Sequence, residues 1–182
     1  KVKANLKNGY KVYFDSNGYH EVPKLVYWHG IDSYEGKSES LFFELCKGRD
    51  TIIDVGANIG YFTVLAMTAN EDANIWSFEP VPKIQKRLQM NVTANPGTNV
   101  NCSSVAISNN NGTSKFYVPK SDENVIPQAS SMNKEWYSHM EEIEVQTQTM
   151  DSFFKEHNLD MNRPFIKLDC EHHEYEVMEG MP

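Results

Sequence analysis

One segment, residues 51–61 with the sequence TIIDVGANIGY, constrains the fold of this chain more than any other. Its first five residues are mostly apolar and β-branched, which predicts a buried strand, and residues 61–69 have the character of a helix. Between them, Gly56 lets the backbone turn sharply and approach a ligand closely, and Gly60 permits close helix–strand packing. A strand, a glycine-bearing turn and a helix in this order are typical of a ligand-binding α/β fold.

The acidic residue ahead of this turn selects between two classes of cofactor. Dinucleotide enzymes usually carry the pattern G-x-G-x-x-G, but here the first position is Asp54, which would repel a pyrophosphate. A carboxylate suits a cationic or hydroxyl-bearing ligand, so the pattern D-x-G-x-x-x-G indicates S-adenosylmethionine. Glu79 follows a second predicted strand and can accept hydrogen bonds from both ribose hydroxyls of an adenosyl group. Two alternatives stay open: a nucleotide-dependent oxidoreductase, and two acids that are merely solvated strand ends.

The rest of the pattern predicts an α/β protein with a doubly wound, Rossmann-like parallel sheet, because strands alternate with helices. Strands are expected over residues 51–55, 74–78, 99–105 and 165–168. Helices are expected over about 38–47, 61–69, 150–157 with Thr149 as N-cap, and 174–179, and another helix begins at Pro82. Residues 113–118 and 143–149 alternate apolar and polar side chains, which predicts an antiparallel pair inserted at the sheet edge. The long polar stretch between them is a candidate lid or binding loop.

The first residues predict a separate β unit. Asn8-Gly9 tolerates the positive φ angles of a tight turn, so residues 2–6 and 10–14 are expected to form a hairpin. We therefore expect residues 1–30 to form a small antiparallel β unit and residues 31–182 to form the ligand-binding domain.

Composition excludes several classes of function. A net charge of −8 and a pI near 5.2 argue against nucleic-acid binding, and Lys83, Lys86 and Arg87 are interpreted as the solvated face of a helix. No apolar run is long enough for a membrane span. The three cysteines are widely spaced and form no pair, which favours a reduced, cytoplasmic setting. Sequons at Asn91, Asn101 and Asn111 are about as many as chance gives and decide nothing.

The sequence resembles the FkbM-type S-adenosylmethionine-dependent methyltransferases. The matching segments are 53–63 (IDVGANIGYFT), 78–80 (FEP), 105–108 (VAIS), 147–153 (TQTMDSF), 165–174 (FIKLDCEHHE) and Tyr34-Glu35 ahead of the first helix of the main domain. They follow one another in order over roughly residues 30–182. The resemblance implies a class I methyltransferase fold and methyl transfer, usually to a hydroxyl oxygen of a natural product or sugar.

The same resemblance implies roles for particular positions. Those expected at the methionine end of the cofactor are Asp54, Gly56, Asn58 and Gly60; Glu79 would hold the ribose, and Ser104 to Ala106 would lie near the adenine. Asp169, Glu171 and His173 would face the transferable methyl group, with Asp169 also near the cofactor. The chain departs from the family at His172, where glycine is usual, and an imidazole there disfavours the backbone conformation that glycine accepts.

Methyl transfer to an alcohol requires alignment of the acceptor and removal of its proton. His173 is the expected base because imidazole titrates near neutral pH, and Asp169 or Glu171 would orient it or hold the acceptor hydroxyl. Part of this cluster also fits a simpler role, since acids at a helix start favourably meet the helix dipole, and Glu174 and Glu176 suit that role better. No native metal site is expected, because consecutive histidines cannot easily face one ion.

Three further expectations concern the whole protein. A non-catalytic S-adenosylmethionine-binding or scaffold domain is the alternative to an enzyme, motivated by His172 and the early end of the chain. The four parallel strands are fewer than a class I methyltransferase sheet contains, so C-terminal strands are expected to be missing. The strand over residues 165–168 would then expose an apolar edge prone to association, and a homodimer is a candidate assembly.

Overall fold

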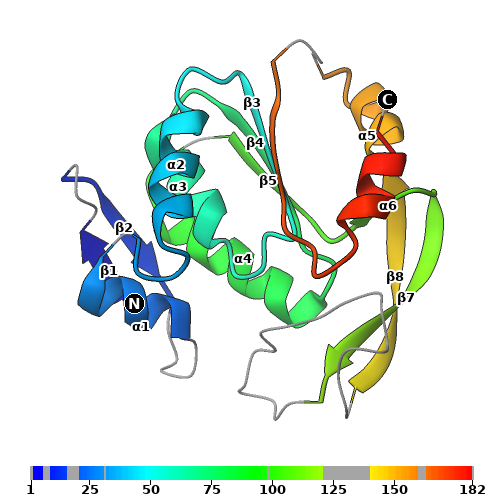
Figure 1. Cartoon of the computed structure of the whole chain (residues 1–182), viewed down its shortest axis with the longest axis horizontal. Helices are drawn as coiled ribbons and strands as arrows, with labels where there is room; N and C mark the ends of the chain where they lie inside the picture. The colour runs from blue at the N-terminus through cyan, green and yellow to red at the C-terminus, as the bar shows by residue number, and fades with distance from the viewer. Residues whose placement is uncertain are drawn as a thin grey trace.

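The computed structural model describes residues 2–5, 9–15, 21–30, 32–97, 99–120, 140–159 and 163–181. Its centre is a four-stranded sheet of β3 (Thr51–Val55), β4 (Asn74–Phe78), β5 (Asn99–Ser103) and β9 (Phe165–Leu168), in the order β5-β4-β3-β9 (Figure 1). All neighbouring pairs are parallel, so the carboxyl ends of the four strands meet at one edge. β3 is fully buried, as its apolar sequence predicts. The expected strands are therefore confirmed, except that β5 ends at Ser103 rather than at residue 105.

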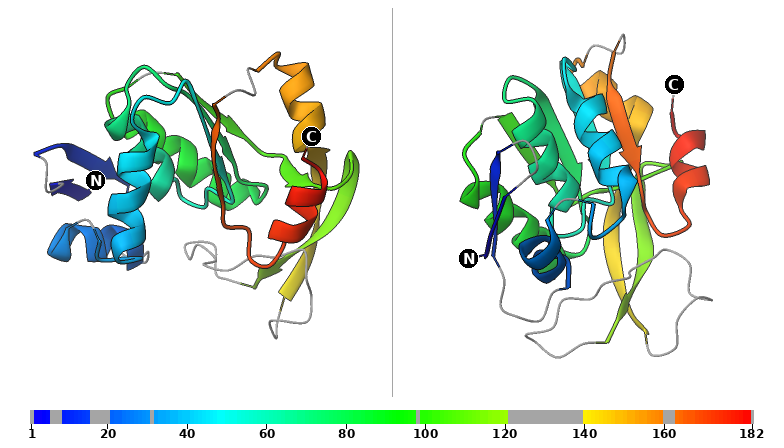
Figure 2. Two further views of the ribbon diagram at one scale, coloured as in Figure 1. Left: turned by 45° about the horizontal axis from the view of Figure 1, so that its top comes forward. Right: turned by 60° about the vertical axis from the view of Figure 1, so that its left-hand side comes forward.

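Helices cover both faces of this sheet (Figures 1 and 2). On one face lie α2 (Lys37–Cys46), α3 (Tyr61–Ala69) and α4 (Pro82–Ala94), and α5 (Met150–Glu156) and α6 (Glu174–Glu179) lie on the other. Because neighbouring residues of a strand point to opposite faces, Ile52 packs with the first group of helices and Ile53 with the second. Thr149 caps α5 as expected, since its side chain accepts a hydrogen bond from the Ser152 N–H at 3.1 Å.

A second sheet stands beside the first. It has the order β6-β8-β7 and consists of β6 (Ala106–Ser108), β7 (Gly112–Pro119) and β8 (Met140–Thr149). The expected antiparallel pair is confirmed as β7 and β8, but its position at the edge of the parallel sheet is wrong. The two strands instead form a separate sheet with β6, which pairs in parallel with residues 147–149 of β8. Most of the stretch expected to be a lid, residues 121–139, lies outside the described residues.

The N-terminal segment is only partly β. β1 (Val2–Asn5) and β2 (Lys11–Phe14) form the expected antiparallel hairpin, and Gly9 has a φ of 86°. Residues 21–29, however, form α1 (Glu21–His29), so the β unit expected over residues 1–30 is confined to the hairpin. The helix forms because Val22 and Val26, four residues apart, are both buried on one face.

Side chains of α4 and of Asn95, the residue that follows it, hold the hairpin against the main domain. Asn95 receives a hydrogen bond from the Tyr13 N–H at 2.8 Å and returns one to the Tyr13 carbonyl at 2.7 Å. Asn91 accepts from the Asp15 N–H at 2.6 Å and donates to the Ile59 carbonyl at 2.7 Å. Arg87 pairs with Asp15, so the interpretation of this arginine as part of a solvated face is wrong.

Within the described ranges, no helix is long and apolar enough to cross a membrane.

Candidate functional site

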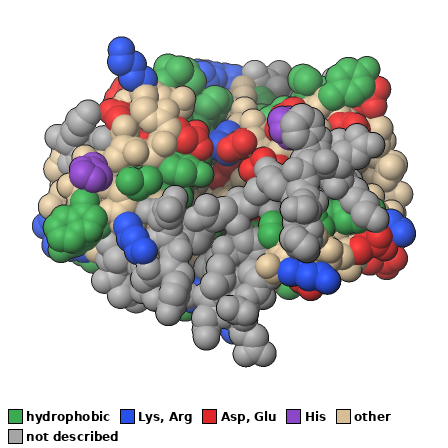
Figure 3. Space-filling model, turned by 60° about the horizontal axis from the view of Figure 1, so that its bottom comes forward, with side chains coloured by type: hydrophobic (Ala, Val, Ile, Leu, Met, Phe, Trp, Pro, Cys, Tyr) green, Lys and Arg blue, Asp and Glu red, His purple; other side chains and the backbone are tan. Residues whose placement is uncertain are grey.

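A cavity opens at the edge where the parallel strands end. The segments that line it come from the turn after β3, the ends of β4 and β9, residues 105–107 and the loop ahead of α2. This edge is also where the strand order reverses, since the chain leaves β3 toward β4 and later returns to the opposite side of β3 as β9. Ligands of open α/β sheets bind at such a position. A space-filling view of this side shows acidic side chains gathered with a basic one around a hollow (Figure 3).

The two glycines of the turn after β3 are required by neighbouring protein. Gly56 has a φ of 76°, and a Cβ atom there would lie 1.9 Å from the backbone oxygen of Asp169. The expected close approach at Gly56 is therefore made by the end of β9. A Cβ atom on Gly60 would lie 2.6 Å from Cδ1 of Leu88, so Gly60 serves contact between α3 and α4 rather than helix–strand packing. Gly56 lines the cavity, and Gly60 is not among its lining residues.

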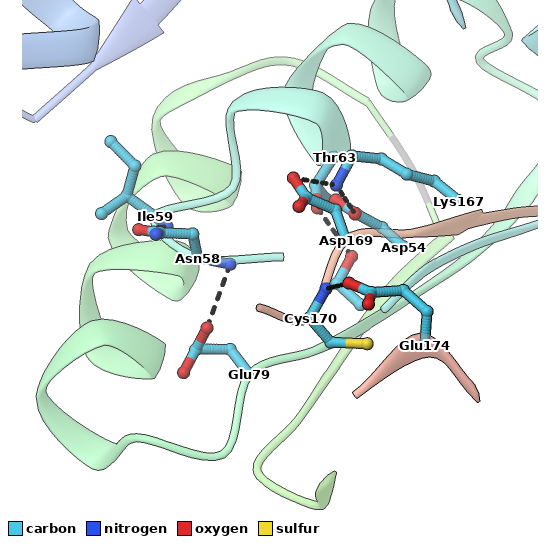
Figure 4. Close-up of polar contacts among 10 residues, drawn as sticks. Asp54, Asn58, Ile59, Thr63, Glu79, Lys167, Asp169, Cys170 and Glu174 are labelled. Carbon is cyan, nitrogen blue, oxygen red and sulfur yellow. Dashed lines mark hydrogen bonds and ion pairs between the residues drawn. The ribbon is translucent and has the colours of Figure 1, made fainter. Parts of the chain in front are cut away.

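Glu79 is a buried carboxylate in the cavity wall, with 6% of its surface exposed. Its Oε2 accepts a hydrogen bond from the Asn58 N–H at 3.1 Å (Figure 4). Its Oε1 accepts a hydrogen bond from the Val81 N–H at 2.9 Å. Burial raises the pKa of Glu79 to about 7, although both backbone hydrogen bonds oppose that effect. A carboxylate has about four lone-pair sites, so each oxygen can still accept one more donor.

The backbone conformation of Asn58 directs its N–H group toward the Glu79 carboxylate. Its φ of 51° lies in the left-handed region, which asparagine tolerates better than most residues. Its own side-chain oxygen accepts from the Ile59 N–H at 2.7 Å, which holds the turn in place. Asn58 lines the cavity, and its expected contact with the methionine end of a cofactor stays a prediction.

Asp54 lies beneath the cavity and does not line it. The side chain has no exposed surface; Oδ2 accepts from the Thr63 hydroxyl at 2.8 Å, and that hydroxyl lies 2.8 Å from the Ser77 hydroxyl. Asp54 Oδ1 lies 3.4 Å from Nζ of Lys167 (Figure 4). The structure thus gives Asp54 a position behind the wall, where it can act on a ligand only through its neighbours.

Lys167, on β9, is a site residue that sequence reasoning missed. Its side chain is 13% exposed, and Nζ lies 3.3 Å from Asp169 Oδ2 and 4.7 Å from the centre of the Phe62 ring. Burial alone would lower the pKa of Lys167, but Asp54, Asp169 and Glu35 outweigh it and raise the pKa. The only signal in the sequence was a single cation within the otherwise apolar strand FIKL.

The segment after β9 brings together the expected catalytic residues. Asp169, Glu171 and His173 all line the cavity, and burial together with nearby Asp169 raises the pKa of Glu171. Glu171 and His172 have φ values of 51° and 69°, both in the left-handed region. The backbone at His172 thus has the conformation that glycine accepts most readily. His172 itself is exposed and does not line the cavity.

Both ring nitrogens of His173 face protein partners. Nε2 lies 3.0 Å from the Ser108 hydroxyl, and Nδ1 lies 3.4 Å from Glu176 Oε2. Burial lowers the pKa of His173 and outweighs the opposite effect of nearby Glu176 and Glu174. The imidazole is therefore neutral over a wider pH range than usual, as a proton acceptor must be. Glu174, the first residue of α6, accepts from the Cys170 N–H at 2.9 Å and so ties the loop after β9 to the start of the helix.

The loop ahead of α2 contributes Tyr34 and Glu35 to the cavity. Glu39 positions this loop: its fully buried carboxylate accepts from the Tyr34 N–H at 2.9 Å, the Glu35 N–H at 2.7 Å and the Tyr61 hydroxyl at 2.8 Å. Burial and nearby Asp169 raise the pKa of Glu35. Sequence reasoning missed Glu39, although an acid at the third position of a helix is a known capping signal.

The opposite part of the wall is mostly apolar. Val105, Ala106 and Ile107 line the cavity there together with Ile84 and Phe116. Ser104, expected near an adenine, is exposed and is not among the lining residues, whereas Ala106 is buried in the wall.

In the part of the chain that the structure describes, no three His, Cys, Asp or Glu side chains are grouped so that they could hold a metal ion.

A large part of the chain matches a known protein family. The family model of the methyltransferase FkbM domain matches residues 54–182, a range that begins at the buried aspartate of β3 and includes the ends of β4 and β9. No curated protein is significantly similar to the chain.

Proposed function

Because the chain belongs to the FkbM methyltransferase family, we propose that it transfers the methyl group of S-adenosylmethionine to a hydroxyl oxygen of a sugar or another natural product. The proposal includes the doubly wound, class I form of the methyltransferase fold, which the order β5-β4-β3-β9 and the helices on both sheet faces support. The observation that carries the cofactor assignment is the buried carboxylate of Glu79 in the cavity wall.

The residues of the cavity fit the chemical groups of this cofactor. Glu79 retains acceptor sites for two ribose hydroxyls, and Asn58 fixes it in place through the backbone. The apolar wall at Val105, Ala106 and Ile107 suits a flat adenine ring. Asp169 supplies negative charge that suits the amino group and the sulfonium. When bound, the cofactor supplies an activated methyl group on a cationic sulfur.

The protein then has two tasks at the end of β9. Asp169 or Glu171 accepts a hydrogen bond from the acceptor hydroxyl and aligns its oxygen, which lowers the entropic part of the barrier. His173 takes the hydroxyl proton on Nε2 after this nitrogen exchanges Ser108 for the acceptor. Glu176 beside Nδ1 then stabilises the imidazolium that forms.

Calorimetry with S-adenosylhomocysteine tests the cofactor assignment directly. We expect binding by the wild type and a loss of at least about tenfold in affinity in Glu79→Ala, because two charge-assisted hydrogen bonds disappear. Glu44→Gln, on the exposed side of α2, is the matched control and should bind like the wild type. Absence of binding by the folded wild type, or unchanged affinity in Glu79→Ala, contradicts the assignment.

Transfer of a labelled methyl group to a panel of hydroxylated sugars and natural products tests catalysis. We expect at least one acceptor to be labelled and Asp169→Ala to abolish labelling. A protein that binds S-adenosylhomocysteine but labels no acceptor would instead support the alternative of a non-catalytic scaffold domain, which the strained backbone at His172 favours.

A cytoplasmic location is part of the same proposal. All three cysteines of the chain are free, and Asn91, the first residue of a sequon, is 1% exposed with both side-chain atoms hydrogen-bonded, so a glycan has no access to it in the folded protein. Association into a homodimer stays a prediction.

A further inference from the structure

The cavity has an unequal charge balance. Its described lining residues include four carboxylates, Glu35, Glu79, Asp169 and Glu171, and Lys167 is the single lysine or arginine among them. An ammonium group in such a wall is unexpected for a site that takes a sulfonium, because like charges repel. The positive charge of Lys167 must therefore be balanced by nearby carboxylates.

The position of Lys167 shows that it is neutralised by two carboxylates in two different layers. Asp54, fully buried behind the wall, lies 3.4 Å from Nζ, and Asp169, in the wall itself, lies 3.3 Å from it (Figure 4). Asp54 Oδ1 has no hydrogen-bond partner among the described residues, so Lys167 is the charge that compensates it. Two aspartates and one lysine together carry a formal charge of −1.

The two forms of the proposed cofactor differ in charge. S-adenosylmethionine carries a positive sulfur, whereas S-adenosylhomocysteine lacks the methyl group and that charge, and the rest of the two molecules is identical. A charge in the wall therefore acts on the difference between their affinities, while any change in the shared contacts cancels in the ratio. In a partly buried site with an effective dielectric constant near 20, one charge roughly 12 Å away changes such a ratio by about tenfold.

Resting on the function proposed above, we propose that Lys167 is a positioning and charge-balancing residue: held between Asp54 and Asp169, it sets how strongly the cavity prefers the cationic cofactor to its neutral product. It keeps Asp169 at the wall and limits the formal charge of the group Asp54, Lys167 and Asp169 to −1. The remaining negative charge favours binding of the cationic cofactor after each turnover. The ion pair with Lys167 also spares the folded protein the free-energy cost of an unpaired buried carboxylate at Asp54.

The test compares two variants in which no buried carboxylate lacks a partner. Asp54→Asn removes one negative charge from the group, and its amide oxygen can still accept from Thr63. Asp54→Asn/Lys167→Met also removes the positive charge and restores the formal charge of −1. Calorimetry with S-adenosylmethionine and with S-adenosylhomocysteine, without an acceptor, gives the affinity ratio for each protein. We expect the ratio to fall by about three- to tenfold in Asp54→Asn and to return to within about twofold of the wild type in the double variant.

Two controls separate charge from structure. Lys155→Met, on the exposed side of α5 and paired with Asp151 in its own helix, should leave the ratio unchanged. Lys167→Arg keeps the charge and should also retain the ratio. Circular dichroism melting curves verify that each variant is folded. If Lys167 had a merely structural role, its replacement would lower the affinities for both ligands in parallel and leave their ratio unchanged.

The outcomes distinguish this inference from the function on which it rests. A wild type that binds neither ligand refutes the proposed function, and the inference with it. A wild type that binds both ligands, with the same ratio in Asp54→Asn and in the double variant, refutes only the charge-balancing role of Lys167.

Discussion

The buried carboxylate of Glu79 makes a quantitative prediction about pH. Burial raises its pKa from an ordinary 4.5 to about 7, so the folded protein holds this proton more tightly than the unfolded chain does. The corresponding stabilisation is complete below about pH 4.5 and is lost as the pH rises to about 7. Because one pH unit corresponds to about 1.4 kcal/mol, the loss amounts to about 3 kcal/mol of unfolding free energy.

Glu79→Gln isolates this contribution, because glutamine has nearly the same shape and does not titrate. The variant loses one of the two backbone hydrogen bonds, to Asn58 or Val81, which costs about 1–2 kcal/mol at every pH. Relative to the wild type, it should gain about 3 kcal/mol between pH 4.5 and pH 8. Urea denaturation of the ligand-free proteins, followed by circular dichroism at several pH values, measures the difference, and other titrating groups cancel in it.

The same carboxylate should make ligand binding depend on pH. Ribose hydroxyls donate to the ionised form, so the affinity for S-adenosylhomocysteine should rise with pH, by at most tenfold per unit, and level off above about 7. Glu79→Gln should remove this dependence. A stability difference between the two proteins that is independent of pH, or that grows in the wild type's favour as the pH rises, would show that the environment of Glu79 has been misjudged.

Three other predictions concern the backbone and the packing around the site. His172→Gly should raise the unfolding free energy by about 0.5–1 kcal/mol, because it relieves a left-handed φ of 69° and that gain exceeds the added chain entropy; a lower denaturation midpoint would contradict this. Gly56→Ala should cost at least about 3 kcal/mol, since its Cβ atom would lie 1.9 Å from a backbone oxygen, whereas Gly9→Ala, at a similar φ with nothing within 4 Å, should cost only about 1–2 kcal/mol in the same denaturation assay. Asn91→Ala should lower the unfolding free energy by about 2–3 kcal/mol, because two hydrogen bonds to distant backbone groups are lost. The control Asn101→Ala, at an exposed position, should lie within about 0.5 kcal/mol of the wild type. Equal effects of the two substitutions would refute the role of Asn91 in holding the N-terminal hairpin against α4.

Much of the fold follows from local sequence. The apolar strand over residues 51–55, the turn glycines and the helical periodicity that follows are properties of neighbouring residues, and the structure reproduces them. Glu79 and Asp169 were also predictable as cavity residues, because each comes directly after a strand of a parallel sheet and such ends meet at one edge. The helix over residues 21–29 was missed because the turn signals around it resemble those of a hairpin, and the burial of Val22 and Val26 is a tertiary fact.

The sequence by itself determined the parallel strands, most of the helices, and the presence of Glu79 and Asp169 at the carboxyl edge of the sheet. Only the tertiary structure decided what those side chains do to one another. In the folded protein, Asp54 lies behind the cavity wall and pairs with Lys167. Both ring nitrogens of His173 lie close to protein partners, Ser108 and Glu176. The reason is physical: secondary structure depends on dihedral preferences and periodicity within a few residues, whereas burial and ion pairing depend on the distance between groups that the chain separates by up to more than a hundred positions.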